Sequence, residues 1–536
     1  MKRFLIICLS VFCIHASAQK IQRPKLVIGM VVDQMRWDYL YRYIDRYGNG
    51  GFRRLLDDGF SCENAFIPYT PTYTAAGHAS VYTGSVPALN GIPGNNWYSR
   101  EEKKVIYCTD DTVHTIGSTS VAGNMSPRHL WSNTITDELR MATNFQNKTI
   151  SIALKDRGSI LPGGFTSNGS YWFDNATGGW ITSSFYMNAL PAWIQKFNDR
   201  HLPDEYLKQN WNTLYPIQSY VQSFTDSNRY EGRLEDRTFP HMTSAITSNK
   251  YESFRTTPFG NTYTLEMAKA AIENEQLGKR NVTDFLSVSL SSTDYIGHTF
   301  GPNSIEVEDT YLRLDQDLAS FLTYLDNTIG KGQYLLFLTA DHGVANNPYM
   351  VSDYKMPSGA LNTPLVRRVL DDSLSRNFLV RNLVSEVINY QVYLDDELIA
   401  ENGLDKKSIC KYIINFLMHQ PAVANAVVLS DLNEATLTQT QRMMLTNGYN
   451  QKLSGDIQFM LKPQWFESFQ SGTTHGSWNP YDAHIPLLWF GWHVKKGALN
   501  REVYMTDIAA TVAAFLHIQM PTACIGKVIT EVKSDK

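Results

Sequence analysis

Four short stretches of the chain are dominated by apolar residues, and each is followed by charged or metal-binding side chains. The stretches cover residues 25–32, 149–154, 285–290 and 334–339. Such runs are typical of strands that are buried on both faces of a parallel sheet. The side chains that follow them are Asp33, Lys155 with Arg157, Asp294, and Asp341 with His342. Open α/β sheets bind ligands at the carboxyl ends of their strands. We therefore predict an α/β fold with a mostly parallel central sheet, flanked by helices, and a site at that edge.

Helices are predicted between these strands. Residues 303–327 and 265–275 carry apolar side chains at spacings of three and four, which is the pattern of a helix with one buried face. Thr506 and Asp507 form a capping pair in front of an apolar stretch at 508–516. The chain therefore alternates strands and helices, as an α/β fold requires.

Three stretches are much longer than the loops that usually connect a strand and a helix in an α/β fold. The distance in sequence between His342 and His475 far exceeds what one connection needs. Two others are rich in Gly, Ser, Asn, Trp and Pro. We predict one catalytic domain, residues 19–536, with cap-like insertions at about 95–145 and 160–260 and an inserted subdomain at about 345–470.

Residues 1–18 have the form of a secretory signal. Lys2 and Arg3 precede an apolar run, and Ala16-Ser17-Ala18 is a cleavage motif. The run is too short to span a bilayer as an anchor, and no later stretch of the sequence is long and apolar enough. We expect cleavage after Ala18 and a periplasmic or secreted protein without a membrane span.

Composition restricts the partners and the covalent links. The net charge is -4, so the chain lacks the excess of basic residues that is typical of proteins that bind nucleic acid. Four cysteines follow the signal, namely Cys62, Cys108, Cys410 and Cys524. In an oxidising compartment they could pair, with Cys62–Cys108 as one candidate bridge, but the sequence does not choose among the connectivities. The oligomeric state is not specified either.

Six aspartates and histidines have the spacing of two metal sites. Asp294 and His298 are four residues apart, which puts them on one side of a helical turn, and His475 would complete a group of three. The second group would be Asp33, Asp341 and His342. Mixed Asp and His ligands favour zinc, and three protein ligands leave room for substrate. Two such metals form a clamp for in-line displacement at phosphorus, in which one activates the attacking oxygen and the other holds the leaving oxygen. We predict two Zn²⁺ per chain and phosphoryl transfer to water.

A candidate nucleophile lies in the segment PTYTAAGH. The small residues after Thr74 indicate a loop that leads into a helix, whose N-terminus favours anions. A threonine hydroxyl is a weak nucleophile that metal coordination can activate. Thr72 is an alternative, and Thr74 could also be a plain helix cap.

Several motifs together resemble the alkaline phosphatase superfamily. They are VVDQMRWDYL, the Thr74 loop, GNNW, SSTDYIGH, TADHG and TTHGSWNPYDAHIPL. More narrowly, the chain resembles the secreted bacterial alkaline phosphatases of the PafA-like type, which use a threonine nucleophile. The resemblance implies that Thr74 binds the second zinc and becomes phosphorylated, and that the two groups of three ligands hold the zinc ions.

The same resemblance implies three contacts to the phosphoryl oxygens. Asn95 would donate its amide, with Asn96 as an alternative, and Lys155 and Arg157 would bind a doubly charged phosphate. Lys155 would also supply the charge that a magnesium ion supplies in some members, since no further metal ligand follows His342. On an extended segment, residues 155 and 157 would point the same way.

The predicted function is hydrolysis of small-molecule phosphate monoesters. The alternative is a phosphodiesterase or nucleotide pyrophosphatase on the same core, although a diester would make less use of two cations. A sulfatase is disfavoured because its Cys/Ser-x-Pro-x-Arg motif is missing around Thr74, and a cofactor-independent mutase by the export signal. A non-catalytic, metal-stabilised binding protein is a remote alternative, because the nucleophile and all six ligands are present. The sequence does not name the physiological substrate.

Overall fold

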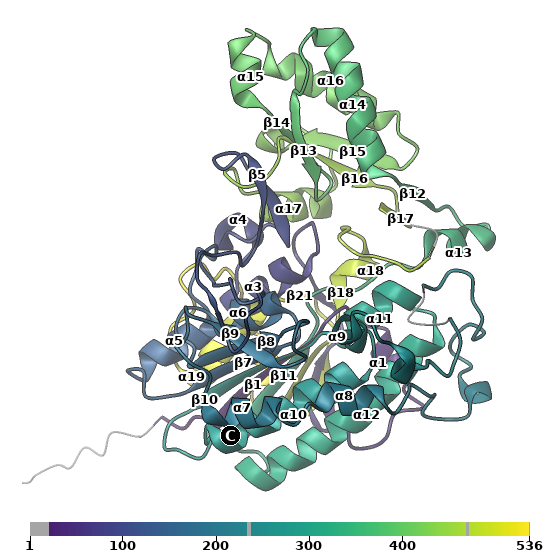
Figure 1. Ribbon diagram of the computed structural model, residues 1–536. Helices are drawn as coiled ribbons and strands as arrows, with labels where there is room; N and C mark the ends of the chain where they lie inside the picture. Colours follow the sequence, from purple (N-terminus) through teal and green to yellow (C-terminus); the bar gives the residue numbers. More distant parts are fainter. Residues whose placement is uncertain (1–20, 233–236, 468–470, 535–536) are drawn as a thin grey trace, which may run out of the picture.

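A ten-stranded sheet forms the centre of the molecule (Figure 1). The computed structural model describes residues 21–232, 237–467 and 471–534, so the predicted signal at 1–18 lies outside the described residues. In spatial order the strands are β20 (Gly497–Leu499), β2 (Phe60–Cys62), β19 (Leu487–Gly491), β11 (Tyr334–Thr339), β1 (Leu26–Val32), β10 (Asp284–Leu290), β7 (Thr149–Ala153), β8 (Gly169–Phe173), β9 (Trp180–Ser183) and β6 (Thr115–Ile116).

The middle of the sheet is parallel, as predicted. β11, β1, β10, β7 and β8 run in one direction, whereas β19 and β9 pair antiparallel to their neighbours. The four stretches predicted as strands are β1, β7, β10 and β11, and all their residues are buried. Val32 pairs with Leu290, and Val31 pairs with Thr339. Because these strands end nearly level, the residues that follow them meet at one edge.

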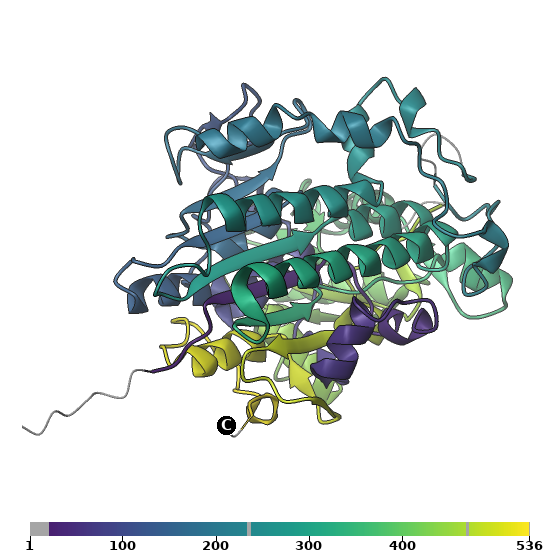
Figure 2. The same ribbon diagram turned by 90° about the horizontal axis from the view of Figure 1, so that it is seen from below.

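Helices cover both faces of the sheet, which buries its apolar residues (Figures 1 and 2). One face carries α3 (Thr74–Thr83), α5 (Ile135–Ala142), α6 (Asp156–Gly163) and α19 (Asp507–Leu516). The other carries α2 (Phe52–Asp58), α7 (Ala192–Asn198), α8 (Leu202–Leu207), α10 (Phe259–Asn274) and α12 (Ile305–Leu325). Ser304 caps α12 by accepting a hydrogen bond from the Val307 amide. The two helices predicted from apolar spacing correspond to α10 and α12, and the helix predicted from its cap corresponds to α19. Thr506 is the N-cap of α19, but its side chain makes no capping hydrogen bond.

Part of the stretches expected above the sheet belongs to the sheet itself. Residues 160–260 contribute β8 and β9, and residues 95–145 contribute β6. Residues 95–145 also form a separate hairpin of β4 (Asn96–Ser99) and β5 (Lys104–Tyr107). The difference has a packing cause, because Tyr171, Trp172 and Trp180 are almost fully buried. The Gly and Asn around them indicate loops, but the aromatic side chains fill the core.

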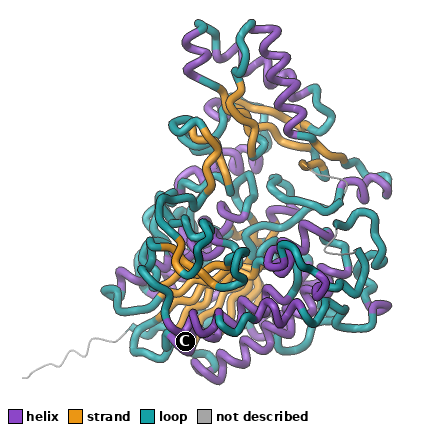
Figure 3. The backbone as a smooth tube through the Cα atoms, viewed as in Figure 1, coloured by secondary structure: helices purple, strands orange, loops and turns teal. Residues whose placement is uncertain are grey.

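The chain leaves the central sheet after β11 and builds a second sheet, as Figure 3 shows. We call residues 359–467 the inserted unit. Its strands lie in the order β13 (Val384–Ile388), β14 (Gln391–Leu394), β16 (Ile457–Leu461) and β15 (Val423–Val428), with helices α14 (Thr363–Phe378), α15 (Asp396–Glu401), α16 (Lys406–Met418) and α17 (Gln439–Gly448). The unit has its own cluster of buried apolar residues. The chain enters and leaves it side by side, since β12 (Gly359–Leu361) pairs with β17 (Trp465–Glu467). The domain limits at 345 and 470 stay a prediction.

Shorter elements connect these parts. They are α1 (Tyr39–Arg42), β3 (Ala65–Phe66), α4 (Pro87–Asn90), α9 (Lys250–Arg255), α11 (Ser292–Phe300), α13 (Pro348–Asp353), α18 (Pro480–Ala483), β18 (His484–Ile485) and β21 (Val503–Tyr504). Among the described residues, none of the helices combines the length and the apolar character that a membrane crossing needs.

The candidate disulfide is not formed. Cys62, Cys108, Cys410 and Cys524 are all free. Cys62 packs in the main hydrophobic core, whereas Cys108 belongs to a separate cluster around Trp97. A bridge between Cys62 and Cys108 is therefore wrong, because each side chain is committed to a different part of the interior.

Candidate active site

The edge of the central sheet brings together the six predicted ligands in two groups of three. Asp33 follows β1, and Asp341 and His342 follow β11. Asp294 lies in the first turn of α11, directly after β10, and His475 lies on the segment that returns from the inserted unit. We call Asp294, His298 and His475 the open group, and Asp33, Asp341 and His342 the deep group.

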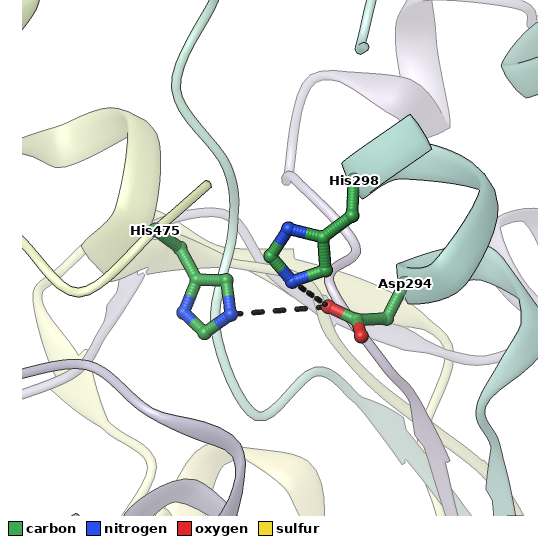
Figure 4. A group of neighbouring side chains, drawn as sticks. All are labelled: Asp294, His298 and His475. Carbon is green, nitrogen blue, oxygen red and sulfur yellow. Dashed lines mark ion pairs between the residues drawn. The ribbon is translucent and has the colours of Figure 1, made fainter. Parts of the chain in front are cut away.

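In the open group two imidazoles point toward one carboxylate (Figure 4). Asp294 Oδ1 lies 3.2 Å from His298 Nε2 and 3.9 Å from His475 Nε2. The Nδ1 atoms of these histidines lie 2.8 Å from Thr473 O and 2.7 Å from Thr72 O. Since a carbonyl oxygen only accepts hydrogen bonds, each Nδ1 carries a proton, and Nε2 is the ring atom of each histidine that faces the group and could bind a metal. The 34% exposure of the His298 side chain makes this group accessible to solvent.

The deep group is fully enclosed, with Asp33, Asp341 and His342 all at 0% exposure. His342 Nε2 lies 3.6 Å from Asp33 Oδ1 and 3.4 Å from Asp341 Oδ2, and its Nδ1 lies 2.9 Å from Gly343 O. Within the described residues, neither Asp33 Oδ1 nor Asp341 Oδ2 accepts a hydrogen bond. Buried carboxylate oxygens without donors are costly unless a cation binds them. The donor set therefore fits a divalent metal.

Burial and crowding of charge shift the pKa values of the carboxylates in opposite directions. Burial raises the pKa of Asp33 well above its ordinary value, and Asp341 raises it further. Burial also acts to raise the pKa of Asp294, but His298 and Lys155 outweigh it and hold that pKa well below the ordinary value. In the deep group itself, burial acts to raise the pKa of Asp341, but His342 and His78 outweigh it and lower that pKa, so the two carboxylates of the group differ in how well their charge is balanced.

Thr74 lies against the deep group. It is the first residue of α3, and its Oγ1 lies 3.2 Å from His342 Nε2. The N-cap of α3 is Tyr73, so Thr74 is not a capping residue. The Thr72 hydroxyl instead donates to Ser477 O at 2.9 Å. The structure brings Thr74 to the predicted ligands and directs Thr72 elsewhere.

α3 approaches the strand ends closely because residue 77 is glycine. A Cβ at Gly77 would lie 2.4 Å from Asp341 O, which no real side chain tolerates. His78 on the same helix contacts Thr74 O at 2.9 Å and Ser289 Oγ at 2.8 Å, and its Nδ1 lies 3.4 Å from Asp341 Oδ2. The helix and the deep group are therefore held as one rigid piece.

Asn95 and Lys155 also reach this edge. Asn95 Oδ1 accepts a hydrogen bond of 2.9 Å from the Ala75 amide at the start of α3, which fixes how its amide is oriented. Asn96, the alternative, lies in β4 with its Nδ2 3.5 Å from Ile106 O. Lys155 Nζ lies 2.8 Å from Asp33 Oδ2 and 2.5 Å from Asp294 Oδ2, so it contacts both groups. Burial acts to lower the pKa of Lys155, but Asp294 and Asp33 raise it above its ordinary value.

Arg157 is not on an extended segment, so that expectation is wrong. Lys155 is the N-cap of α6, and Arg157 lies in the first turn of that helix. Its Nη1 donates to the Tyr107 hydroxyl at 2.8 Å. Burial acts to lower the pKa of Arg157, whereas Tyr107 and Asp156 raise it well above its ordinary value. Both side chains stay charged, but the contacts with the two groups are those of Lys155, whereas Arg157 contacts Tyr107.

Gln34 is a site residue that the sequence analysis missed. Its Nε2 donates to Asp294 Oδ1 at 2.7 Å, and its backbone amide donates to Asp341 Oδ1 at 3.1 Å. It is almost fully buried, with a φ of 66°. Gln34 thus links the two groups, and its place directly after Asp33 was the one signal that could have indicated it.

Comparisons with known proteins place the chain in a family. Residues 27–482 match the family described as type I phosphodiesterase / nucleotide pyrophosphatase. The chain is 51% identical to the alkaline phosphatase PhoV of Synechococcus elongatus, over 98% of this chain and 99% of PhoV. It is also 51% identical to a protein of Myroides odoratus named a calcium-transporting ATPase, over 98% of this chain and 97% of the relative.

A third relative has solved structures. The alkaline phosphatase PafA of Elizabethkingia meningoseptica is 47% identical over 96% of each chain. Wild-type PafA matches with a TM-score of 0.93, covering 96% of this chain and 100% of PafA. A PafA variant with equally good agreement has one threonine replaced by serine, and an asparagine, a lysine and an arginine replaced by alanine. This chain therefore belongs to the type I phosphodiesterase / nucleotide pyrophosphatase family and, within it, to the group of the PhoV and PafA alkaline phosphatases.

Proposed function

We propose that this protein is a zinc-dependent alkaline phosphatase that hydrolyses small-molecule phosphate monoesters through a phosphothreonine at Thr74. The activity follows from the identity of 51% to PhoV and 47% to PafA over nearly the whole of each chain. The observation that carries the mechanism is the contact of 3.2 Å between Thr74 Oγ1 and a ligand of the deep group. The zinc ions and the nucleophile are our assignment.

Asp294, His298 and His475 would hold one zinc ion, and Asp33, Asp341 and His342 the other. The Nε2 atoms that face each group and the buried carboxylate oxygens without hydrogen-bond donors support this assignment. When bound, the two ions would supply the positive charge that favours the alkoxide of Thr74 and the developing charge on the leaving oxygen. Thr74 would serve as a further ligand at the deep group.

Thr74 would attack phosphorus as the ester bond breaks, and water would then release phosphate from the threonine. Its place as the first residue of α3 supports this role, because amide groups at a helix N-terminus favour an anion there. The buried contacts of His78 and Asn95 around α3 hold the hydroxyl in place. A fixed nucleophile lowers the entropic part of the barrier.

Asn95, Lys155 and Arg157 would bind the non-bridging phosphoryl oxygens. The orientation of Asn95, whose oxygen accepts from Ala75, leaves its NH₂ group as a donor. Lys155 is a buried cation and Arg157 a partly buried one, and both suit a doubly charged phosphate. The PafA variant altered at one threonine, asparagine, lysine and arginine carries changes at the same four residue types.

A phosphodiesterase is the second candidate, because the matching family carries that name. A diester has one charge less and an additional group on phosphorus, so it would use Lys155 and Arg157 less well. The deciding experiment measures kcat/KM for an aryl phosphate monoester and for the matching methyl aryl diester, with zinc content determined on the same sample. A preference for the diester would overturn the monoesterase assignment.

We further propose that residues 1–18 export the protein to the periplasm or the exterior. The charged start, the apolar run and the Ala16-Ser17-Ala18 motif support this. Mass spectrometry of the protein recovered from cells would test it, since cleavage after Ala18 leaves Gln19 as the first residue.

A further inference from the structure

The tip of a hairpin in the inserted unit is strained. β13 and β14 pair with Ile388 opposite Gln391, so their turn consists of two residues, Asn389 and Tyr390. Both have positive φ values, of 59° and 58°. This is the geometry of the two-residue hairpin turn that prefers Asn-Gly. Asn389 suits it, but a bulky side chain with positive φ is unusual and costs energy.

The surrounding sheet fixes this turn. The Tyr390 carbonyl accepts hydrogen bonds of 2.9 Å from the Phe459 amide and from Gln458 Nε2. Asn389 Nδ2 donates to Asn96 O at 2.7 Å, which ties the turn to the β4–β5 hairpin of the central part. A Cβ at Gly94 would lie 2.9 Å from Asn389 Nδ2, so the approach is close. A strained residue held this firmly is more typical of a functional position than of a linker.

Tyr390 faces two adjoining cavities beside the site. One, of about 460 Å³, is lined by Tyr73, Asn95, Asn389 and Tyr390, among others. The other, of about 360 Å³, shares Tyr73 and Tyr390 and reaches His298 and His475 of the open group. Tyr73 is the residue directly before Thr74. The two tyrosines therefore line the space that leads from the proposed nucleophile past the open group.

The chemistry of this space favours an uncharged aromatic group. Tyr73 lies edge-on to His475 and Tyr390 edge-on to Phe459, so the space ends on two aromatic pairs to which a further ring can add. The Asn95 and Asn389 side chains also line it. The one cation in the larger cavity, Arg367, is paired with Glu386. Glu467 lines both cavities and would repel an anionic leaving group.

We propose that Tyr390, with Tyr73, forms a binding site for an aromatic leaving group of the phosphate monoester. The proposal rests on the proposed function, because in-line attack by Thr74 directs the leaving group away from α3 and toward the open group. The strained turn of the inserted unit would then hold the Tyr390 ring beside the leaving group of the substrate. Tyr390 is thus a specificity-determining residue.

The test replaces Tyr390 with glycine, which accepts positive φ and keeps the turn. The zinc-loaded enzyme is assayed with phenyl phosphate and methyl phosphate, and inhibited with phenylphosphonate and methylphosphonate. We expect the ratio of kcat/KM for the phenyl ester to kcat/KM for the methyl ester to fall about tenfold. A well-placed pair of aromatic rings strengthens binding by about that factor. The inhibition constant of phenylphosphonate should rise by a similar factor, and that of inorganic phosphate should not change.

Two further variants separate a binding role from a structural one. Tyr390→Phe keeps the ring and should keep the phenyl preference. Leu379→Gly removes another side chain with positive φ in the same unit, one that is 89% exposed, and should leave both esters unchanged. Equal losses for both esters in Tyr390→Gly, or an unchanged ratio, would overturn the proposal. Absence of methyl phosphate hydrolysis in the parent enzyme would instead count against the proposed function itself.

Discussion

The two ligand groups have similar chemistry but opposite surroundings. The deep group has two carboxylates and one imidazole with no exposure, and it is built from strand ends. The open group has one carboxylate and two imidazoles, and it is built from a helix and a returning loop beside a cavity. The difference indicates that the two groups have different roles. The enclosed, more anionic group suits a permanently held ion beside Thr74, the proposed nucleophile, and the open group suits contact with the proposed leaving group.

The largest expected effect concerns Thr74, which contacts the deep group alone. Thr74→Ala should abolish the phosphoenzyme and lower kcat/KM on the order of 10³-fold or more, because binding does not replace a nucleophile. Both zinc ions should remain, since the three protein ligands of each group are intact. The measurement is rapid acid quench followed by peptide mapping, with zinc content alongside.

Thr72→Ala is the matched control, because its hydroxyl donates to Ser477 O and should not take part in the reaction. Phosphate trapped on Thr72 in the parent enzyme would contradict the assignment. Loss of the deep zinc ion in Thr74→Ala would show that the hydroxyl is needed to hold that metal.

The next effect concerns Lys155, which contacts a carboxylate of each group, together with Arg157. Replacing both with alanine should lower kcat/KM for a monoester on the order of 10²-fold or more, since charge-assisted hydrogen bonds contribute about 1.5–3 kcal/mol each. A diester offers less charge and should lose much less. The comparison needs both substrates and the zinc content of the variant.

Lys148→Ala removes a lysine at the other end of β7, where it pairs with Glu275, and should leave the ratio of the two substrates unchanged. Equal losses for monoester and diester in the double variant would mean that Lys155 and Arg157 only hold the fold.

A smaller effect separates the two groups directly. A chelator should remove the two zinc ions in two phases, with the open group about tenfold faster, because fewer carboxylates and greater access favour release. Stopped-flow measurement with a chromogenic chelator would follow both phases. His298→Ala should delete the fast phase. A single phase that releases both ions would show that the groups act as one unit.

The smallest effect concerns Gln34, whose side chain contacts the open group and whose backbone contacts the deep group. Gln34→Asn keeps a residue that tolerates positive φ but shortens the contact with Asp294. We expect the fast phase alone to accelerate, by about three- to tenfold. Removing a hydrogen-bond partner of a metal ligand typically weakens metal binding about tenfold or more, and shortening the partner should have a smaller effect. Gln276→Asn, at another glutamine with positive φ, is the control and should change neither phase. Acceleration of the slow phase as well would mean that Gln34 supports both groups through the backbone.

The sequence predicted the parts of the molecule that depend on local pattern and strand ends. The runs before Asp33, Asp294 and Asp341 indicated adjacent parallel strands, and the spacing of Asp294 and His298 indicated one helical face. His475 was predicted to complete the open group, but no local pattern places a residue across an insertion, so its position there depended on the structure.

Other features could not be predicted, for reasons of packing. The aromatic strands β8 and β9 are framed by residues typical of loops, so their burial outweighed local preference. Tyr390 occupies a turn position where glycine is the usual signal, and only the contacts from Gln458 and Phe459 make that geometry stable. The separation of Cys62 from Cys108 is likewise a property of the assembled core.

The order of the ligands along the chain has a consequence for the timing of biosynthesis. The deep group has all its residues once position 342 has been made, but the open group lacks its third ligand until the ribosome has added His475. A nascent chain that already contains Thr74 and the deep group thus still lacks the third residue of the open group. Both groups can therefore assemble only after the whole inserted unit has been translated.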